Sequence, residues 1–215
     1  MSKSLGNVVD PYQVVDEFGT DVFRYFLLRE IPFGQDGDFS KNAIVTRVNG
    51  ELANGLGNLV SRTLGMIEKY FDGNVPEPTA FTAEDESIRE KAFAAVGTFE
   101  KEMDEIAFHK ALVSLWDYIA EVNKYVDESA PWTLAKEDNQ ERLATVLWTI
   151  VQAIGVVTIL IYPFMPESAE KIWSRLGSSD SLDSKHLTHA KEWGVVQSGQ
   201  TVVKGDSLFP RFDDK

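Results

Sequence analysis

Residues 141–165, ERLATVLWTIVQAIGVVTILIYPFM, decide the fold of this chain. Apolar side chains recur in this stretch at three- and four-residue steps, so they cover a wide stripe of one helix. The stretch is long enough to cross a bilayer, but threonines and a glutamine interrupt it, and Pro163 and Pro166 close it. We therefore favour the central helix of a soluble bundle over a membrane span, with the helix covering residues 141–162.

The rest of the sequence predicts a mainly α protein. Apolar periodicity, N-cap residues such as Thr20 and Thr82, and terminating glycines mark the other helices. These helices cover residues 11–18, 21–29, 40–70, 82–103, 108–126 and 166–177, with a short helical turn at 131. Near the end of the chain, residues 201–203 and 207–209 flank Lys204-Gly205-Asp206, a pattern that predicts a short β hairpin.

The long helix over residues 40–70 contains three glycines in its interior: Gly50, Gly55 and Gly57. Each is unfavourable by roughly 1 kcal/mol relative to alanine in a helix. Close packing against a neighbouring helix would explain them, and so would a kink.

Composition limits the kinds of function that the chain can have. It has 215 residues, no cysteine, and a formal net charge of −13 from 21 basic and 34 acidic residues. Disulfides and thiolate metal sites are excluded, and the three scattered histidines predict no metal site. The charge argues against broad phosphate binding. It still allows a small site that reads unstacked RNA bases through stacking and base-edge hydrogen bonds.

The first residues carry the clearest chemical motif. Lys3, between Ser2 and Ser4 and followed by a Leu-Gly-Asn run, could place a point charge on polyphosphate oxygens. A solvated lysine at a disordered terminus is the alternative. The stretch resembles the Lys-Met-Ser-Lys-Ser loop of class I aminoacyl-tRNA synthetases. Its leading lysine would precede Met1, so we expect the chain to be the C-terminal part of a longer synthetase.

Later blocks extend this resemblance along most of the chain, to the bacterial methionyl-tRNA synthetases. The blocks are Gly19-Thr20-Asp21, residues 24–30 and 33–40, residues 51–54 and 56–62, Asn123-Lys124-Tyr125, Ala130-Pro131-Trp132 and Leu208-Phe209-Pro210-Arg211. The resemblance implies three parts. Residues 1–40 would form the signature loop and a connecting, stem-contact subdomain. Residues 41–180 would form an anticodon-binding α-helical bundle, and residues 181–215 a tail with the hairpin.

The resemblance also implies an activity for the parent enzyme. It would attach methionine to tRNA(Met) in the cytoplasm, using ATP and Mg²⁺, and would recognise the anticodon CAU. Met1, Ser2, Lys3 and Ser4 would contact the ATP phosphates. The partners of this chain would be the tRNA(Met) anticodon loop and the missing N-terminal catalytic domain of the same enzyme. We expect the fragment to be monomeric, without membrane association, without cofactors of its own and inactive alone.

Three residues are implied as anticodon contacts by matching motif: Asn58, Arg62 and Trp132. Asn58 and Arg62 are four residues apart, so they leave one face of one helix. Asparagine can donate to and accept from a base edge, arginine offers a planar fork of donors, and tryptophan offers a stacking face. Each residue also has a structural interpretation: Arg62 as a solvated partner of an acid, Asn58 as a helix-contact residue, and Trp132 as a plug of the bundle end.

Two other interpretations remain open at this stage. A valyl- or isoleucyl-type synthetase shares the opening loop but differs in the later blocks. A helical-bundle protein-interaction module without RNA binding fits the acidic charge. It predicts that Asn58, Arg62 and Trp132 are scattered or buried. We expect Trp116, Trp148 and Trp173 to lie in the core.

Overall fold

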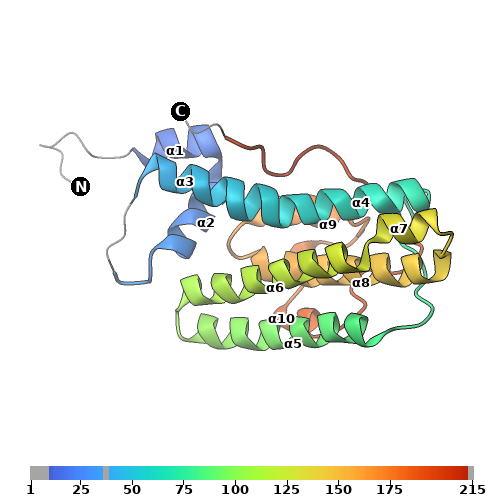
Figure 1. Cartoon of the computed structure of the whole chain (residues 1–215). Helices are drawn as coiled ribbons and strands as arrows, with labels where there is room; N and C mark the ends of the chain where they lie inside the picture. Colours follow the sequence, from blue (N-terminus) through green and yellow to red (C-terminus); the bar gives the residue numbers. More distant parts are fainter. Residues whose placement is uncertain (1–9, 36–38, 213–215) are drawn as a thin grey trace, which may run out of the picture.

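The structure is a computed structural model, and it describes residues 10–35 and 39–212 (Figure 1). The described residues form a helical bundle. Its elements are α1 (Pro11–Phe18), α2 (Thr20–Glu30), α3 (Lys41–Arg47), the π-helical segment η2 (Val48–Gly57), α4 (Asn58–Tyr70), α5 (Ala83–Asp104), α6 (Phe108–Ser129), α7 (Pro131–Lys136), α8 (Gln140–Ile161), α9 (Pro166–Arg175), the 3₁₀ turn η3 (Leu182–Ser184) and α10 (Leu187–Ala190). The mainly α prediction is confirmed.

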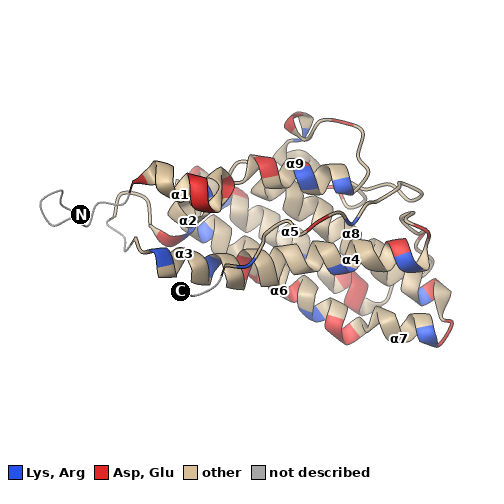
Figure 2. Cartoon of the chain, turned by 90° about the horizontal axis from the view of Figure 1, so that it is seen from above, with Lys and Arg blue, Asp and Glu red and all other residues tan. Residues whose placement is uncertain are grey.

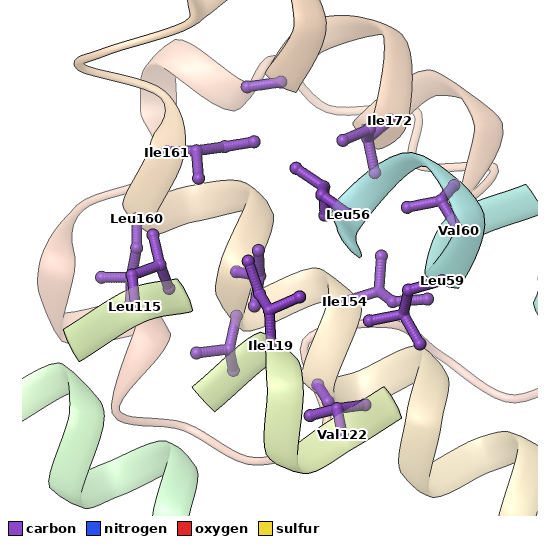
Figure 3. Packing of buried hydrophobic residues seen from close by; sticks show 14 of the residues in the cluster. Leu56, Leu59, Val60, Leu115, Ile119, Val122, Ile154, Leu160, Ile161 and Ile172 are labelled. Carbon is purple, nitrogen blue, oxygen red and sulfur yellow. The ribbon is translucent and has the colours of Figure 1, made fainter. Parts of the chain in front are cut away.

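α8 is the central helix of this bundle. It packs against α4, α5, α6, α7, α9 and α10. Its most apolar window is long enough to cross a membrane, but 94% of that window is buried inside the protein. Figure 3 shows Ile154, Leu160 and Ile161 of α8 among side chains from α4, α6 and α9. The helix is apolar on nearly all sides because protein covers nearly all sides.

The long helix predicted over residues 40–70 is continuous, but it is not α-helical throughout. Ser40 caps its start by accepting from the Ala43 amide at 3.2 Å. The middle ten residues, η2, form a π helix between α3 and α4. A wider turn in the middle of a helix changes the direction in which the side chains project, and such turns are frequent at functional sites.

The carboxylate of Glu51 in η2 joins this helix to the preceding segment. Its oxygens accept from Arg29 at 3.0 Å, from Arg47 at 2.7 Å, and from the Tyr25 hydroxyl. The backbone oxygen of Glu51 accepts from Trp116 Nε1 on α6 at 3.2 Å. Burial, followed by the Glu51 charge, raises the pKa of Tyr25 well above its usual range, so its hydroxyl stays protonated and donates. One residue thus connects α2, α3 and α6 to η2.

Two motif residues attach α2 to the far side of the bundle. Asp21 accepts from the Ser168 amide at 2.6 Å, so it caps the first turn of α9. Arg24 donates to the backbone oxygens of Phe164 at 2.9 Å and Pro163 at 2.7 Å. These bonds hold α2 against the turn between α8 and α9.

A second buried ion pair links α5, α6 and α8. The fully buried carboxylate of Asp85 accepts from both terminal nitrogens of Arg142, at 2.5 and 2.9 Å, and from the Tyr125 hydroxyl. It also accepts from the Thr82 amide at 2.7 Å, which completes a capping box at the start of α5. The cluster fixes the end of α6 relative to the start of α8, and these two helices flank α7.

The prediction of a C-terminal hairpin is wrong. Within the described tail, Thr201 forms an isolated antiparallel bridge with Asn74, and residues 201–203 do not pair with 207–209. The Val202 amide donates to Gly73 O at 2.8 Å and the Val203 amide to Arg175 O at 2.9 Å. The local pattern had the right extended conformation, but its partners are distant in sequence.

Residues 199–212 instead form an extended strap that runs along α4 and η2 toward α1 (Figure 1). The Lys204 amide donates to Glu68 at 2.8 Å, and the Asn49 side-chain amide bonds both backbone groups of Phe212, at 2.8 and 3.0 Å. The Phe212 ring contacts the Phe18 ring of α1 at 4.7 Å between centroids. The strap therefore lies along most of the long helix.

The strap also accounts for Gly57. A Cβ on Gly57 would lie 3.0 Å from Leu52 O and 3.2 Å from the Phe209 ring. Close packing is therefore confirmed there, although its partner is the strap rather than a neighbouring helix. Gly50 differs, because a Cβ there would meet nothing within 4 Å.

We predict that Asp85→Asn lowers the free energy of unfolding by about 3 kcal/mol at pH 7, because it leaves Arg142 without its buried partner. Burial alone would raise the pKa of Asp85, but the hydrogen bonds from Arg142, Thr82 and Tyr125 outweigh it and hold the pKa below its usual range. The stabilisation is therefore present above the unfolded-state pKa of about 3.9 and is lost as the pH falls through the lower folded value.

Urea unfolding of the unmodified chain and of Asp85→Asn, at pH 7 and at pH 3, measures the difference between their free energies of unfolding. Glu86→Gln is the matched control, because its pair with Arg89 is exposed and should contribute less than about 0.5 kcal/mol. An Asp85→Asn effect as small as the control would contradict the prediction.

We predict opposite effects for alanine at two glycines of η2. Gly50→Ala should raise the free energy of unfolding by roughly 0.5–1 kcal/mol, because alanine loses less backbone entropy and meets open space. Gly57→Ala should lower it, because the new methyl group must displace Phe209. Thermal unfolding of the two variants and of the unmodified chain checks the signs, and a gain at Gly57 would show that the strap contact is loose.

Candidate functional site

A groove of about 570 Å³ runs between the long helix and α6. One wall comes from η2 and α4 and the other from α6. Its lining includes Gly50, Asn54, Asn58 and Arg62 on the first wall and Trp116, Asn123, Lys124 and Asp127 on the second. Two of the three residues predicted to contact an anticodon, Asn58 and Arg62, therefore lie in one surface depression.

The guanidinium of Arg62 is held by α6. Nη1 donates to Asp127 Oδ1 at 2.7 Å, and Nη2 donates to both the backbone and the side-chain oxygen of Asn123, each at 2.9 Å. The Arg62 side chain is 23% exposed and that of Asp127 is 64% exposed. The acid partner that the structural interpretation predicted is present. The pair lies at the rim of the groove, where solvent screens it.

Asn123 is the more buried of these two partners. Its Nδ2 donates to Ile119 O on its own helix at 3.0 Å and to Gly55 O of η2 at 3.4 Å. These bonds leave its side-chain oxygen directed at Arg62. The side chain of Asn123 makes no hydrogen bond to the nearby Pro131-Trp132 turn, because its bonds go to Ile119, Gly55 and Arg62.

Asn58, the first residue of α4, is exposed and lines the groove. Its side chain can therefore meet a ligand from solvent. Asn54, one turn earlier, accepts from Arg211 of the strap, so the strap reaches the edge of the same groove.

Trp132 lies outside the groove lining, on the short helix α7. Ala130 before it adopts a left-handed conformation, with φ 43° and ψ 58°, and Pro131 occupies the first helical position. This sharp turn leaves Pro131 buried and Trp132 40% exposed. In both views α7 lies at the same end of the bundle as the end of α4 (Figures 1 and 2). The exposure of Trp132 and Asn58 contradicts the burial that a protein-interaction module without RNA binding allowed, while the position of Trp132 outside the groove leaves the three residues only partly clustered.

The charge around the groove is mixed. Lys124 and Glu128 form an exposed pair at 3.7 Å, and Glu51 and Asp127 add further acid. Figure 2 shows acidic and basic segments interspersed along the helices, with no continuous basic stripe on the face in view. Such a surface can form directed hydrogen bonds and stacking contacts, but it attracts a polyanion only weakly.

The remaining sequence predictions have different outcomes. Met1, Ser2, Lys3 and Ser4 lie outside the described residues. Among the described residues, no cluster of three His, Cys, Asp or Glu side chains could hold a metal ion.

Two of the three tryptophans predicted for the core lie there. Trp116 and Trp173 are buried. Trp148 is half-buried, because it belongs to an aromatic row at the surface with Phe81 and Trp193. Trp193, which the sequence left unassigned, packs in this row.

The contacts that hold Arg62 were not predicted from the sequence. Asn123 and Asp127 are one helical turn apart on α6, which was a usable signal for a shared face. Their pairing with Arg62, more than 60 residues earlier, had no local signal.

Two family models together match most of this chain. A family model described as "Anticodon binding domain of methionyl tRNA ligase" matches residues 75–215, and one described as "tRNA synthetases class I (M)" matches residues 1–64. The methionine–tRNA ligase of Caldanaerobacter subterraneus is 45% identical over 99% of this chain and 33% of its own length. That of Thermotoga maritima is 41% identical over 100% and 34%. The chain thus spans about a third of the length of these curated relatives.

Solved structures agree as well. Mycobacterium tuberculosis methionyl-tRNA synthetase in complex with methionyl-adenylate superposes with a TM-score of 0.91 at 40% identity, covering 98% of this chain and 41% of that one. The apo form of the same enzyme gives a TM-score of 0.88 at 38% identity, covering 97% and 42%. With this fold and this extent of sequence match, the chain belongs to the family of the anticodon-binding domain of methionyl-tRNA ligases.

Proposed function

We propose that this chain recognises the CAU anticodon of tRNA(Met) through Asn58, Arg62 and Trp132. One observation carries the proposal: Asn58 and Arg62 lie together on the wall of an open groove. The exposed Trp132 adds a large aromatic face on α7, which lies near the C-terminal end of α4.

The three side chains supply complementary chemistry for an unstacked loop. Asn58 offers both a donor and an acceptor to a base edge. Arg62 gives three of its Nη hydrogens to Asp127 and Asn123, which leaves one Nη1 hydrogen for an acceptor atom of a cytosine. Trp132 offers a face on which a base can stack. Base edges and faces are uncharged, so the net charge of −13 does not oppose these contacts as it would oppose broad phosphate binding.

We further propose that the chain serves the reaction named in its relatives, the ATP-dependent attachment of methionine to tRNA, in the cytoplasm and as a monomer. ATP and Mg²⁺ would bind at the signature loop together with the nucleotide-binding part of the enzyme. This loop falls in residues 1–9, outside the described residues.

We predict that the 215-residue chain binds an anticodon stem-loop carrying CAU saturably, and that Trp132→Ala weakens this binding. Loss of one stacked base should cost about 1–3 kcal/mol, or roughly 5- to 150-fold in Kd. A titration followed by fluorescence anisotropy, at low and at moderate salt, measures the effect. Changing the C of the loop to U should also weaken binding.

Two matched variants sharpen this titration. Trp132→Phe keeps an aromatic face and should retain most of the affinity. Phe81→Ala removes a ring of similar exposure, 43% against 40% for Trp132, and should leave Kd unchanged. Equal, weak and salt-sensitive binding to every loop would mean phosphate attraction alone, and it would contradict base recognition.

We predict that this chain alone gives no detectable ATP–pyrophosphate exchange with methionine. The first histidine of the sequence lies in the block His109-Lys110-Ala111-Leu112. This block does not match the histidine signature of a class I nucleotide-binding fold. The radiolabelled exchange assay, with a full-length methionine–tRNA ligase as positive control, checks this. Robust exchange by the chain would show that it contains its own adenylate-forming site.

A further inference from the structure

We propose that Asn123 is a positioning residue for anticodon recognition: it holds the guanidinium of Arg62 in its binding orientation before RNA arrives. The inference rests on the proposed function of the groove. It concerns a residue that would act through Arg62 rather than through a base contact of its own.

The first support is the number and direction of the bonds that Asn123 makes. It accepts from Arg62 Nη2 with two oxygens, its backbone oxygen and its Oδ1, both at 2.9 Å. Two acceptors on one nitrogen, spaced by the geometry of a single residue, restrict rotation about the last bonds of the arginine side chain. A single exposed carboxylate such as Asp127 restricts it less, because water competes for each of its oxygens.

The second support is that the amide of Asn123 can point in only one way. Its Nδ2 donates to two backbone oxygens, Ile119 O and Gly55 O. A flipped amide would place an oxygen against two carbonyl groups and a donor against the donors of Arg62. The Oδ1 that faces Arg62 is therefore determined by the backbone of α6 and of η2.

The third support is that the chain of contacts begins in the π-helical segment. Gly55 lies in η2, whose Glu51 is fixed by Arg29, Arg47 and Trp116. The position of Gly55 O is thus set by the fold, and Asn123 transmits that position to Arg62. The Asp127 contact has no comparable support, since 64% of that side chain faces solvent.

The consequence for recognition is preorganisation. Arginine has several rotatable bonds, and immobilising such a side chain on binding costs about 0.5–1.5 kcal/mol, or roughly 2- to 12-fold in Kd. A guanidinium already held by Asn123 loses less freedom when a base arrives. Removal of the Asn123 side chain should therefore weaken recognition even though Asn123 touches no base.

A double-mutant cycle tests this directly with the CAU stem-loop as the probe. The four proteins are the unmodified chain, Asn123→Ala, Arg62→Ala and the double variant. We expect Asn123→Ala to raise Kd by about 2- to 12-fold when Arg62 is present and by less than about 2-fold when Arg62 is absent. Asn74→Ala, which removes an amide that bonds the strap instead, should leave Kd unchanged.

A second measurement does not use RNA. In the unmodified chain the Arg62 Nε–Hε resonance should show slow hydrogen exchange and restricted motion by NMR relaxation. Asn123→Ala should make this group mobile and fast-exchanging. If Asn123→Ala unfolds below the assay temperature, Asn123→Ser replaces it in both experiments.

The outcomes separate this inference from the proposed function. If the unmodified chain does not bind the CAU loop, the proposed function fails, and this role in recognition fails with it. Suppose that the unmodified chain binds but that Asn123→Ala raises Kd by the same factor with and without Arg62. Asn123 would then act through a direct contact with the RNA or by shaping the groove, and the inference would be overturned. An unchanged Arg62 resonance in Asn123→Ala would also overturn it.

Discussion

The arrangement of this protein depends on one carboxylate in the middle of one helix. Glu51 accepts hydrogen bonds from two arginines and a tyrosine, and its backbone oxygen accepts one from Trp116. Buried or half-buried charges are stabilising only when hydrogen bonds satisfy them on several sides, and Glu51 meets that condition. The carboxylate fixes α2 and α3 against η2, and the backbone oxygen of the same residue fixes α6, whose contact with η2 forms the groove.

The same arrangement is compatible with the proposed nucleic-acid site on a strongly acidic chain. Its described arginines are largely engaged: Arg29 and Arg47 with Glu51, Arg142 with Asp85, and Arg62 with Asp127. Paired in this way, they contribute little long-range attraction for a polyanion. Selectivity would then depend on short-range complementarity at a few side chains, which suits discrimination among bases better than it suits affinity for any RNA.

Sequence patterns predicted most of the helices because their signals are local. Apolar steps of three and four, the Ser40 and Thr82 caps, and the Pro131 and Pro166 helix starts all act within one or two turns. The π segment was missed because a stretch apolar at α-helical steps does not reveal that its turns widen. The hairpin failed for a related reason: strand pattern does not specify a partner, and Asn74 was 127 residues away.

In the candidate site, too, features with a local sequence signal were predicted and features that depend on tertiary contacts were not. The shared face of Asn58 and Arg62 followed from their spacing, whereas the place of Trp132 after a proline suggested a plug of the bundle end and did not predict its exposure. The groove itself could not be predicted, since its second wall comes from α6, a helix that is distant in sequence from η2. The grip of Asn123 on Arg62 is a tertiary contact, so only the structure could reveal it.

The long-range contacts of the strap lead us to expect that it docks late in folding. The strap contacts join Phe212 to Asn49, which lies 163 residues earlier. By contrast, α5 packs against α6, the next helix along the chain. Closing such a long loop has an entropic cost that only a preformed helix surface can offset. During synthesis the bundle can therefore begin to form as its helices emerge, while the strap docks last. In the finished protein the same segment should be the first to detach, at a free energy below that of global unfolding, with hydrogen exchange at Val202 and Phe212 reporting the opening.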